Sequence, residues 1–212
     1  MCDDELHAGL VHLVSDVSAL ILAGGRATRF GGIAKHELVV DGQTIFERQV
    51  AVLAPRVDEI IVSSPRDIAG YRCVRDARDG VGPLAGIAAG LAACRTPWLL
   101  VIAGDMPYVS GELIDQMIAA RDHERAPGDA ASAGVRDIDC VGIRIDSLPE
   151  PLLSILHVSV LPIVERRIAA GQFKASGLLT DEDLRVHWLA GIDRDLVRNM
   201  NAPEDLGTPT RE

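Results

Sequence analysis

The stretch VSALILAGGRATRFGGIAK, residues 17–35, is the part of the sequence from which the fold can be inferred. It opens with a short apolar run that stops at Gly24 and Gly25, as a buried strand of a parallel sheet does. The loop after these glycines contains two arginines, two further glycines and Lys35. A basic, glycine-containing loop directly after a buried strand predicts an anion-binding site at the edge of a sheet.

Short strands and amphipathic helices alternate along the rest of the chain. Alternation with short connections requires right-handed crossovers, which produce a parallel sheet with helices on both faces. In such a sheet, ligands bind beyond the carboxyl ends of the strands. We expect strands over residues 57–62, 71–74, 98–103, 138–145, 186–189 and 195–198, and helical structure over 43–54, 83–94, 110–121 and 148–170.

Composition excludes several classes of function. The 212 residues include 31 acidic and 21 basic side chains, a net charge of -10, so nucleic acid and anionic membrane surfaces are poor partners. No apolar run reaches the roughly 18–20 residues of a membrane span. The four cysteines and six histidines show no metal-ligand spacing. These observations favour a soluble cytoplasmic protein with reduced thiols.

The 21 basic residues comprise two lysines, Lys35 and Lys174, and nineteen arginines. The loop that ends at Lys35 matches neither the P-loop nor the GxGxxG pattern. It nevertheless has the parts of a phosphate cradle, because glycines expose main-chain N–H groups and a compact ammonium makes a point contact with phosphate. The alternative is a flexible surface turn with ordinary arginines. Lys174 has no role that the sequence suggests.

Carboxylates and amides follow other predicted strands. Asp105 comes directly after the strand at 98–103, where it could hold Mg2+ between phosphate oxygens, or form a turn. Asp76 precedes a glycine-rich segment and is a candidate for a base or ribose pocket. Asn199 and Asn201 are two residues apart, so both side chains could point to the same side of a strand end. Asn201 is equally suited to cap a helix.

Four motifs together resemble the molybdenum cofactor guanylyltransferases, members of the nucleotidyltransferase superfamily. The motifs are LAGGRATRFGGIAK (22–35), GPLAGI (82–87), AGDMP (103–107) and NMNAPEDL (199–206). The resemblance implies a Rossmann-like three-layer α/β/α sandwich with a mostly parallel sheet. It also implies transfer of GMP from Mg-GTP to molybdopterin with release of pyrophosphate, and it is compatible with transient contacts to molybdoenzymes or other cofactor-biosynthesis proteins. We expect a tail over 1–15 and one domain over 16–212, with a nucleotide-binding half (16–125) and an acceptor-binding half (126–212).

The resemblance also implies roles for individual residues. Arg29 and Lys35 would hold the triphosphate, Asp105 would bind Mg2+, and Asn199 with Asn201 would lie near the metal and the acceptor phosphate. The nucleotide would further be contacted by a set of residues from three loops: Leu22, Ala23, Gly24, Gly25, Ser63, Asp76 and Gly82.

Several positions depart from the family pattern. Ala34 replaces the usual Asp before the lysine, and Ala202 replaces a Thr. Ser63 replaces an Asn that often reads guanine, which leaves cytidylyl transfer as an alternative. Residues 136–142 lack the expected His-Pro-Thr or Gln-Pro-like sequence, so another phosphorylated acceptor, or nucleotide binding without catalysis, also remains open.

Overall fold

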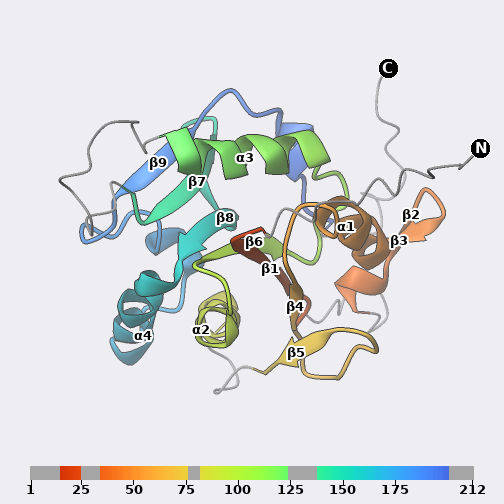
Figure 1. The fold of residues 1–212 in the computed structure, drawn as a ribbon, viewed down its shortest axis with the longest axis horizontal. Coiled ribbons are helices and arrows are strands. Elements are labelled where there is room, and N and C mark those ends of the chain that lie inside the picture. Colours follow the sequence, from red (N-terminus) through yellow and green to blue (C-terminus); the bar gives the residue numbers. More distant parts are fainter. Residues whose placement is uncertain (1–14, 25–33, 76–81, 124–137, 201–212) are drawn as a thin grey trace, which may run out of the picture.

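The computed structural model describes residues 15–24, 34–75, 82–123 and 138–200. A seven-stranded sheet forms the centre, with the strand order β5-β4-β1-β6-β8-β7-β9 (Figure 1). In that order the strands are β5 (Arg72–Val74), β4 (Ile60–Ser63), β1 (Val17–Leu22), β6 (Trp98–Ala103), β8 (Leu148–His157), β7 (Cys140–Ile145) and β9 (Val186–Leu189). Strand β8 is antiparallel to both neighbours and every other pair in this sheet is parallel, so the expected mostly parallel sheet is confirmed.

Helices cover both faces of the sheet, which confirms the three-layer α/β/α arrangement. Helices α1 (Ile45–Leu53) and α3 (Gly111–His123) lie on one face, and α2 (Pro83–Ala93) and α4 (Leu161–Ala169) lie on the other (Figure 1). The short 3-10 turn η2 (Lys35–Glu37) and the hairpin of β2 (Val39–Val40) with β3 (Gln43–Thr44) lead into α1.

Two hydrophobic cores form because side chains of a strand alternate between the faces of the sheet. In β1, Ala19 and Ile21 pack in the core beneath α1 and α3, whereas Leu20 packs in the core beneath α2 and α4. The side chains of β6 alternate in the same way: Leu100 packs in the core beneath α1 and α3, and Leu99 packs in the core beneath α2 and α4. Burial on both faces explains why these strands are apolar without alternation in the sequence.

Helix starts agree with local sequence signals. Thr44 and Glu47 form a capping box at α1, where the Thr44 hydroxyl accepts a hydrogen bond from the Glu47 N–H at 3.1 Å. At α3, the Ser110 hydroxyl accepts one from the Leu113 N–H at 3.2 Å. Pro83 occupies the first turn of α2.

Strand β8 occupies the start of the segment 148–170, for which we expected helix, and this prediction was wrong. Asp146 and Ser147 have φ values of 49° and 68°, and they form a tight turn that folds β8 back onto β7. Pro149 and Pro151 fit an extended chain but not a helix interior. The expected helix survives only as α4, which follows the 3-10 turn η3.

The prediction of a last strand over residues 195–198 was also wrong. The chain there forms the 3-10 turn η5 (Arg194–Val197). The carboxylate of Asp193 accepts a hydrogen bond from the Asp195 N–H at 2.9 Å, which caps the turn. The side-chain cap of Asp193 therefore stabilises a 3-10 turn in place of the strand that the short apolar run predicted.

Cys73, Cys94 and Cys140 are free thiols. Cys140 is buried in β7, and burial, together with the charge of Asp139, raises the pKa of its thiol to about 12. This thiol is therefore structural and unreactive. Among the described residues, no helix has the length and apolar character needed to traverse a bilayer.

Strands β1 and β6 end side by side, with Leu22 opposite Ala103. The Gly104 N–H then donates a hydrogen bond to the Leu22 carbonyl at 3.0 Å. A Cβ atom at position 104 would lie 2.8 Å from that carbonyl oxygen and 3.4 Å from the Ala23 Cα. Both contacts involve backbone atoms, so only glycine permits this approach.

We expect Gly104→Ala to lower the free energy of unfolding by about 1–3 kcal/mol, because a backbone must shift to admit the methyl group. Denaturant-induced unfolding measures this change. Gly24→Ala is the matched control, since its nearest non-neighbouring atom is the Ser63 carbonyl oxygen at 4.0 Å. Equal stabilities of the two variants would contradict the close-approach argument.

Candidate active site

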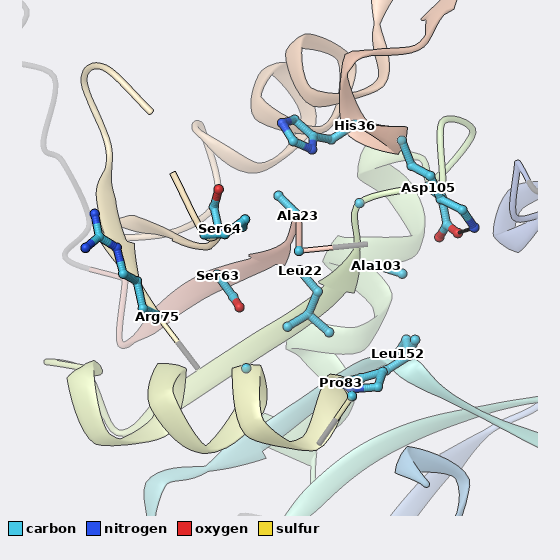
Figure 2. A pocket seen from close by; sticks show the side chains of 16 residues that line it. Leu22, Ala23, His36, Ser63, Ser64, Arg75, Pro83, Ala103, Asp105 and Leu152 are labelled. Atoms are coloured by element: carbon cyan, nitrogen blue, oxygen red, sulfur yellow. Dashed lines mark hydrogen bonds and ion pairs between the residues drawn. The ribbon is translucent and has the colours of Figure 1, made fainter. Parts of the chain in front are cut away.

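A cavity of about 840 Å3 opens at the carboxyl ends of β1, β4 and β6. Its walls come from the chain after each of these strands, from the start of α2, from η2 and from β8. In Figure 2, Arg75 and Ser64 lie on one side, Asp105 lies on the other, and Ala23 and His36 lie between them. The cavity is therefore elongated across the sheet edge at which the sequence predicted ligand binding.

Lys35 and Asp105 meet at one end of this cavity, although 70 residues separate them in the sequence. The distance between Lys35 Nζ and Asp105 Oδ2 is 2.7 Å, and the two side chains are 25% and 16% exposed. The pair is thus partly desolvated but open to the cavity. An ammonium and a carboxylate in this position can bind, respectively, phosphate oxygens and a divalent cation.

The turn that carries Asp105 is held by a buried side chain of α1. Gln49 is 3% exposed, and its Nε2 donates hydrogen bonds to the Ala103 carbonyl at 2.7 Å and to the Met106 carbonyl at 3.1 Å. The Met200 N–H donates to the Asp105 carbonyl at 2.8 Å. Three carbonyls of one turn are therefore fixed from two distant segments, which orients the Asp105 carboxylate.

Two buried serines and Arg75 line the opposite end of the cavity. Ser63 and Ser64 are 4% and 5% exposed. Helix α2 approaches them closely, because a Cβ atom at Gly86 would lie 2.7 Å from the Ser63 hydroxyl oxygen. Gly82, with a φ of 73°, turns the chain into this helix, whose first residues line the cavity. The main-chain N–H groups of a helix N-terminus suit a ligand with polar, electron-rich atoms.

Two further titratable side chains lie near the pair. Burial lowers the pKa of His36, against the opposing effects of the Glu37 charge and the Ala23 carbonyl. Burial also raises the pKa of Glu150, and the negative charge of Asp105 adds to this effect. Glu150 lies on β8 two residues before Leu152, which lines the cavity.

The structure brings the described nucleotide-site candidates together. The candidates that line the cavity are Leu22, Ala23, Gly24, Lys35, Ser63, Gly82 and Asp105. Asn199 does not line it, but the next residue, Met200, is bonded to the Asp105 carbonyl. Asn199 Oδ1 is buried without a hydrogen-bond partner among the described residues. Gly25, Arg29, Asp76 and Asn201 lie outside the described residues.

Sequence reasoning missed His36, Ser64, Glu150 and Leu152. The signal for His36 is its position directly after Lys35. Ser64 directly follows the predicted Ser63. Glu150 and Leu152 flank Pro151 in an X-Pro segment like the one expected over residues 136–142, but a helix was expected over 148–170.

Known proteins are similar to this chain in both sequence and fold. The family model of the MobA-like NTP transferase domain matches residues 19–185. A molybdenum cofactor guanylyltransferase of Pseudomonas putida is 34% identical over 195 residues, which are 89% of this chain and 95% of that protein.

Solved structures also share the fold of this chain. The molybdopterin-guanine dinucleotide biosynthesis protein A of Archaeoglobus fulgidus has a TM-score of 0.68 at 26% identity, covering 89% of this chain and 94% of that one. The 4-diphosphocytidyl-2C-methyl-D-erythritolsynthase of Anaerococcus prevotii has a TM-score of 0.62 at 17% identity, covering 91% and 93%, and so shares the fold. Because the family model spans most of the chain and includes the cavity at the ends of β1, β4 and β6, this protein belongs to the MobA-like NTP transferase family.

Proposed function

We propose that this protein transfers GMP from Mg-GTP to molybdopterin and releases pyrophosphate. The observation that carries the proposal is the Lys35–Asp105 pair at one end of a cavity large enough for a nucleotide. The name of the Pseudomonas putida relative supports the choice of substrates. Transient contact with molybdoenzymes or other cofactor-biosynthesis proteins remains a prediction.

The reaction requires no covalent enzyme intermediate. A terminal phosphate oxygen of molybdopterin forms a bond to the α-phosphorus of GTP, while the bond from that phosphorus to the pyrophosphate oxygen breaks. The protein therefore acts by positioning the reactants and by neutralising charge. Lys35 would stabilise the leaving pyrophosphate, assisted by Arg29, and the main chain of residues 22–24 would hold the nucleotide.

The donor set fits Mg2+. Asp105 offers a carboxylate, and the unpartnered Asn199 Oδ1 lies in the segment bonded to the turn of Asp105. The described residues contain no group of three or more His, Cys, Asp or Glu side chains that could hold a metal by themselves. Mg2+ is usually held by one or two carboxylates together with substrate phosphates, which matches this arrangement. When bound, it would neutralise developing charge on phosphate oxygens.

The two halves of the domain divide the substrates between them in this proposal. Residues 16–125 supply most of the cavity walls, mainly from the chain after β1, β4 and β6 and from the start of α2, and they would bind GTP. Residues 126–212 contribute β8 and the Asn199–Met200 segment beside Asp105, where the acceptor phosphate must arrive.

We expect Lys35→Ala and Asp105→Ala each to lower turnover about a hundredfold or more, because each removes a charge that would act on the phosphates in the transition state. Pyrophosphate release with Mg-GTP and molybdopterin measures this effect. Asp115→Ala is the control, since Asp115 also belongs to an ion pair, with Arg56 at 2.9 Å. Near-wild-type kinetics of either active-site variant would overturn the assignment, and GTP binding without turnover by the wild type would favour a non-catalytic binding protein.

We expect GTP to bind about tenfold or more tightly than CTP, ATP or UTP, despite the serine at position 63. The buried Ser64 hydroxyl and the first turn of α2 line the cavity with polar groups. Guanine has a carbonyl acceptor beside ring N–H and amino donors, a pattern that adenine and the pyrimidines lack, so polar groups that match it select GTP. Calorimetric titration with the four Mg-nucleotides measures the order. Tightest binding of CTP would support cytidylyl transfer instead.

We expect Glu150→Gln to stabilise the protein more at pH 8 than at pH 5. The raised pKa of Glu150 means that the folded state binds its proton more tightly than the unfolded state does. Wild-type stability therefore falls as the pH rises from 4.5 through the raised value, and glutamine removes this loss. Thermal unfolding of both proteins across this range measures the difference, with the exposed Glu165→Gln as the control. A gain that is independent of pH would contradict the explanation.

A further inference from the structure

His36 is a polar side chain of the cavity for which the proposed reaction has no use. It is 9% exposed, and its ring lines the cavity. Figure 2 shows this ring above Ala23, between Ser64 on one side and Asp105 on the other. Since Lys35 and Asp105 mark the phosphate end, His36 lies where the nucleoside of a bound nucleotide would begin.

One ring nitrogen of His36 lacks a partner. Its Nδ1 is buried and has no hydrogen-bond partner among the described residues. A buried polar group left unbonded is destabilising, so such groups call for an explanation. Rotation about χ2 exchanges the two edges of the ring, and a ligand in the cavity can then supply the missing partner.

Neighbouring aromatic side chains hold the ring in place. The ring centroids of His36 and Phe46 are 6.1 Å apart at an interplanar angle of 69°, and those of Phe46 and Tyr71 are 5.1 Å apart at 87°. Both contacts are edge-to-face, a favourable arrangement. The place and plane of the imidazole are therefore set before any ligand binds, whichever of its two edges faces the cavity, and this reduces the entropy lost on binding.

The uncharged form of His36 is suited to a neutral ligand atom rather than to a phosphate. Burial favours the uncharged ring, as its lowered pKa indicates. The charged side chains that line the cavity have opposite partners of their own: Lys35 pairs with Asp105, and Arg75 pairs with Asp67 at 3.0 Å. The neighbouring Glu37 carboxylate favours the charged ring, but burial has the larger effect. A neutral imidazole offers one donor and one acceptor, which matches a ribose hydroxyl or a base edge.

We propose that His36 contacts the nucleoside part of the bound nucleotide and determines how tightly that part is held. The inference rests on the proposed function for the identity of the nucleotide. It assigns a role to a residue that takes no part in neutralising the phosphates.

Binding of Mg-GTP and of inorganic tripolyphosphate, measured by calorimetry, separates the two parts of the ligand. His36→Phe keeps a ring against Phe46 but removes both nitrogens, so we expect GTP to bind about tenfold more weakly and tripolyphosphate to bind unchanged. We expect His36→Asn or His36→Gln, which restore a polar atom near one ring edge or the other, to recover GTP affinity. Lys35→Ala is expected to weaken both ligands.

Thermal unfolding establishes that each variant is folded, and His157→Ala serves as the control. His157 also contacts an aromatic ring, that of Trp98 at 4.9 Å, but it does not line the cavity. Unchanged GTP affinity in folded His36→Phe, or equal losses for GTP and tripolyphosphate, would overturn the inference. Wild-type protein that binds GTP without releasing pyrophosphate would instead refute the proposed function and leave the role of His36 intact, whereas failure of the wild type to bind GTP would overturn both.

Discussion

The parallel pairing of β1 with β6 is the constraint on which the site depends. The ladder keeps Leu22 opposite Ala103, and one further hydrogen bond joins the Gly104 N–H to the Leu22 carbonyl. The loops after both strands therefore start at the same point in space. Both strands are buried on two faces, so a shift in register would move their side chains from one core into the other and disrupt the packing of both. The rigid sheet thus determines where Lys35 and Asp105 can meet.

The site is an edge of the sheet that is stiffened by a few polar contacts from elsewhere. Gln49 reaches from α1 to two carbonyls of the turn after β6, and Met200 bonds to a third. Each bond is modest alone, but a buried amide that lost its partners would be costly. The Asp105 carboxylate is consequently oriented by the backbone of its own turn before any ligand binds.

Local signals made part of this structure predictable. The strand at 98–103, the strand at 186–189 and the start of α2 at Pro83 match the expectations, because apolar runs, turn residues and proline act within a few positions. Lys35 and Asp105 were found from the rule that ligands bind at the carboxyl ends of strands. Strand β8 was not found, because an apolar run such as 152–156 has no period that separates a strand from a buried helix.

The alternation of strands and helices, the glycine-containing loop and the identities of its cations can be inferred from the amino-acid order, because they depend on neighbouring residues. The antiparallel insertion of β8 between β6 and β7 emerges only in the folded chain, since strand pairing joins residues far apart in the sequence. The shifted pKa values of His36 and Glu150 likewise arise on folding, because they respond to burial. No residue type or spacing encodes burial directly, because burial is a property of the whole packed chain.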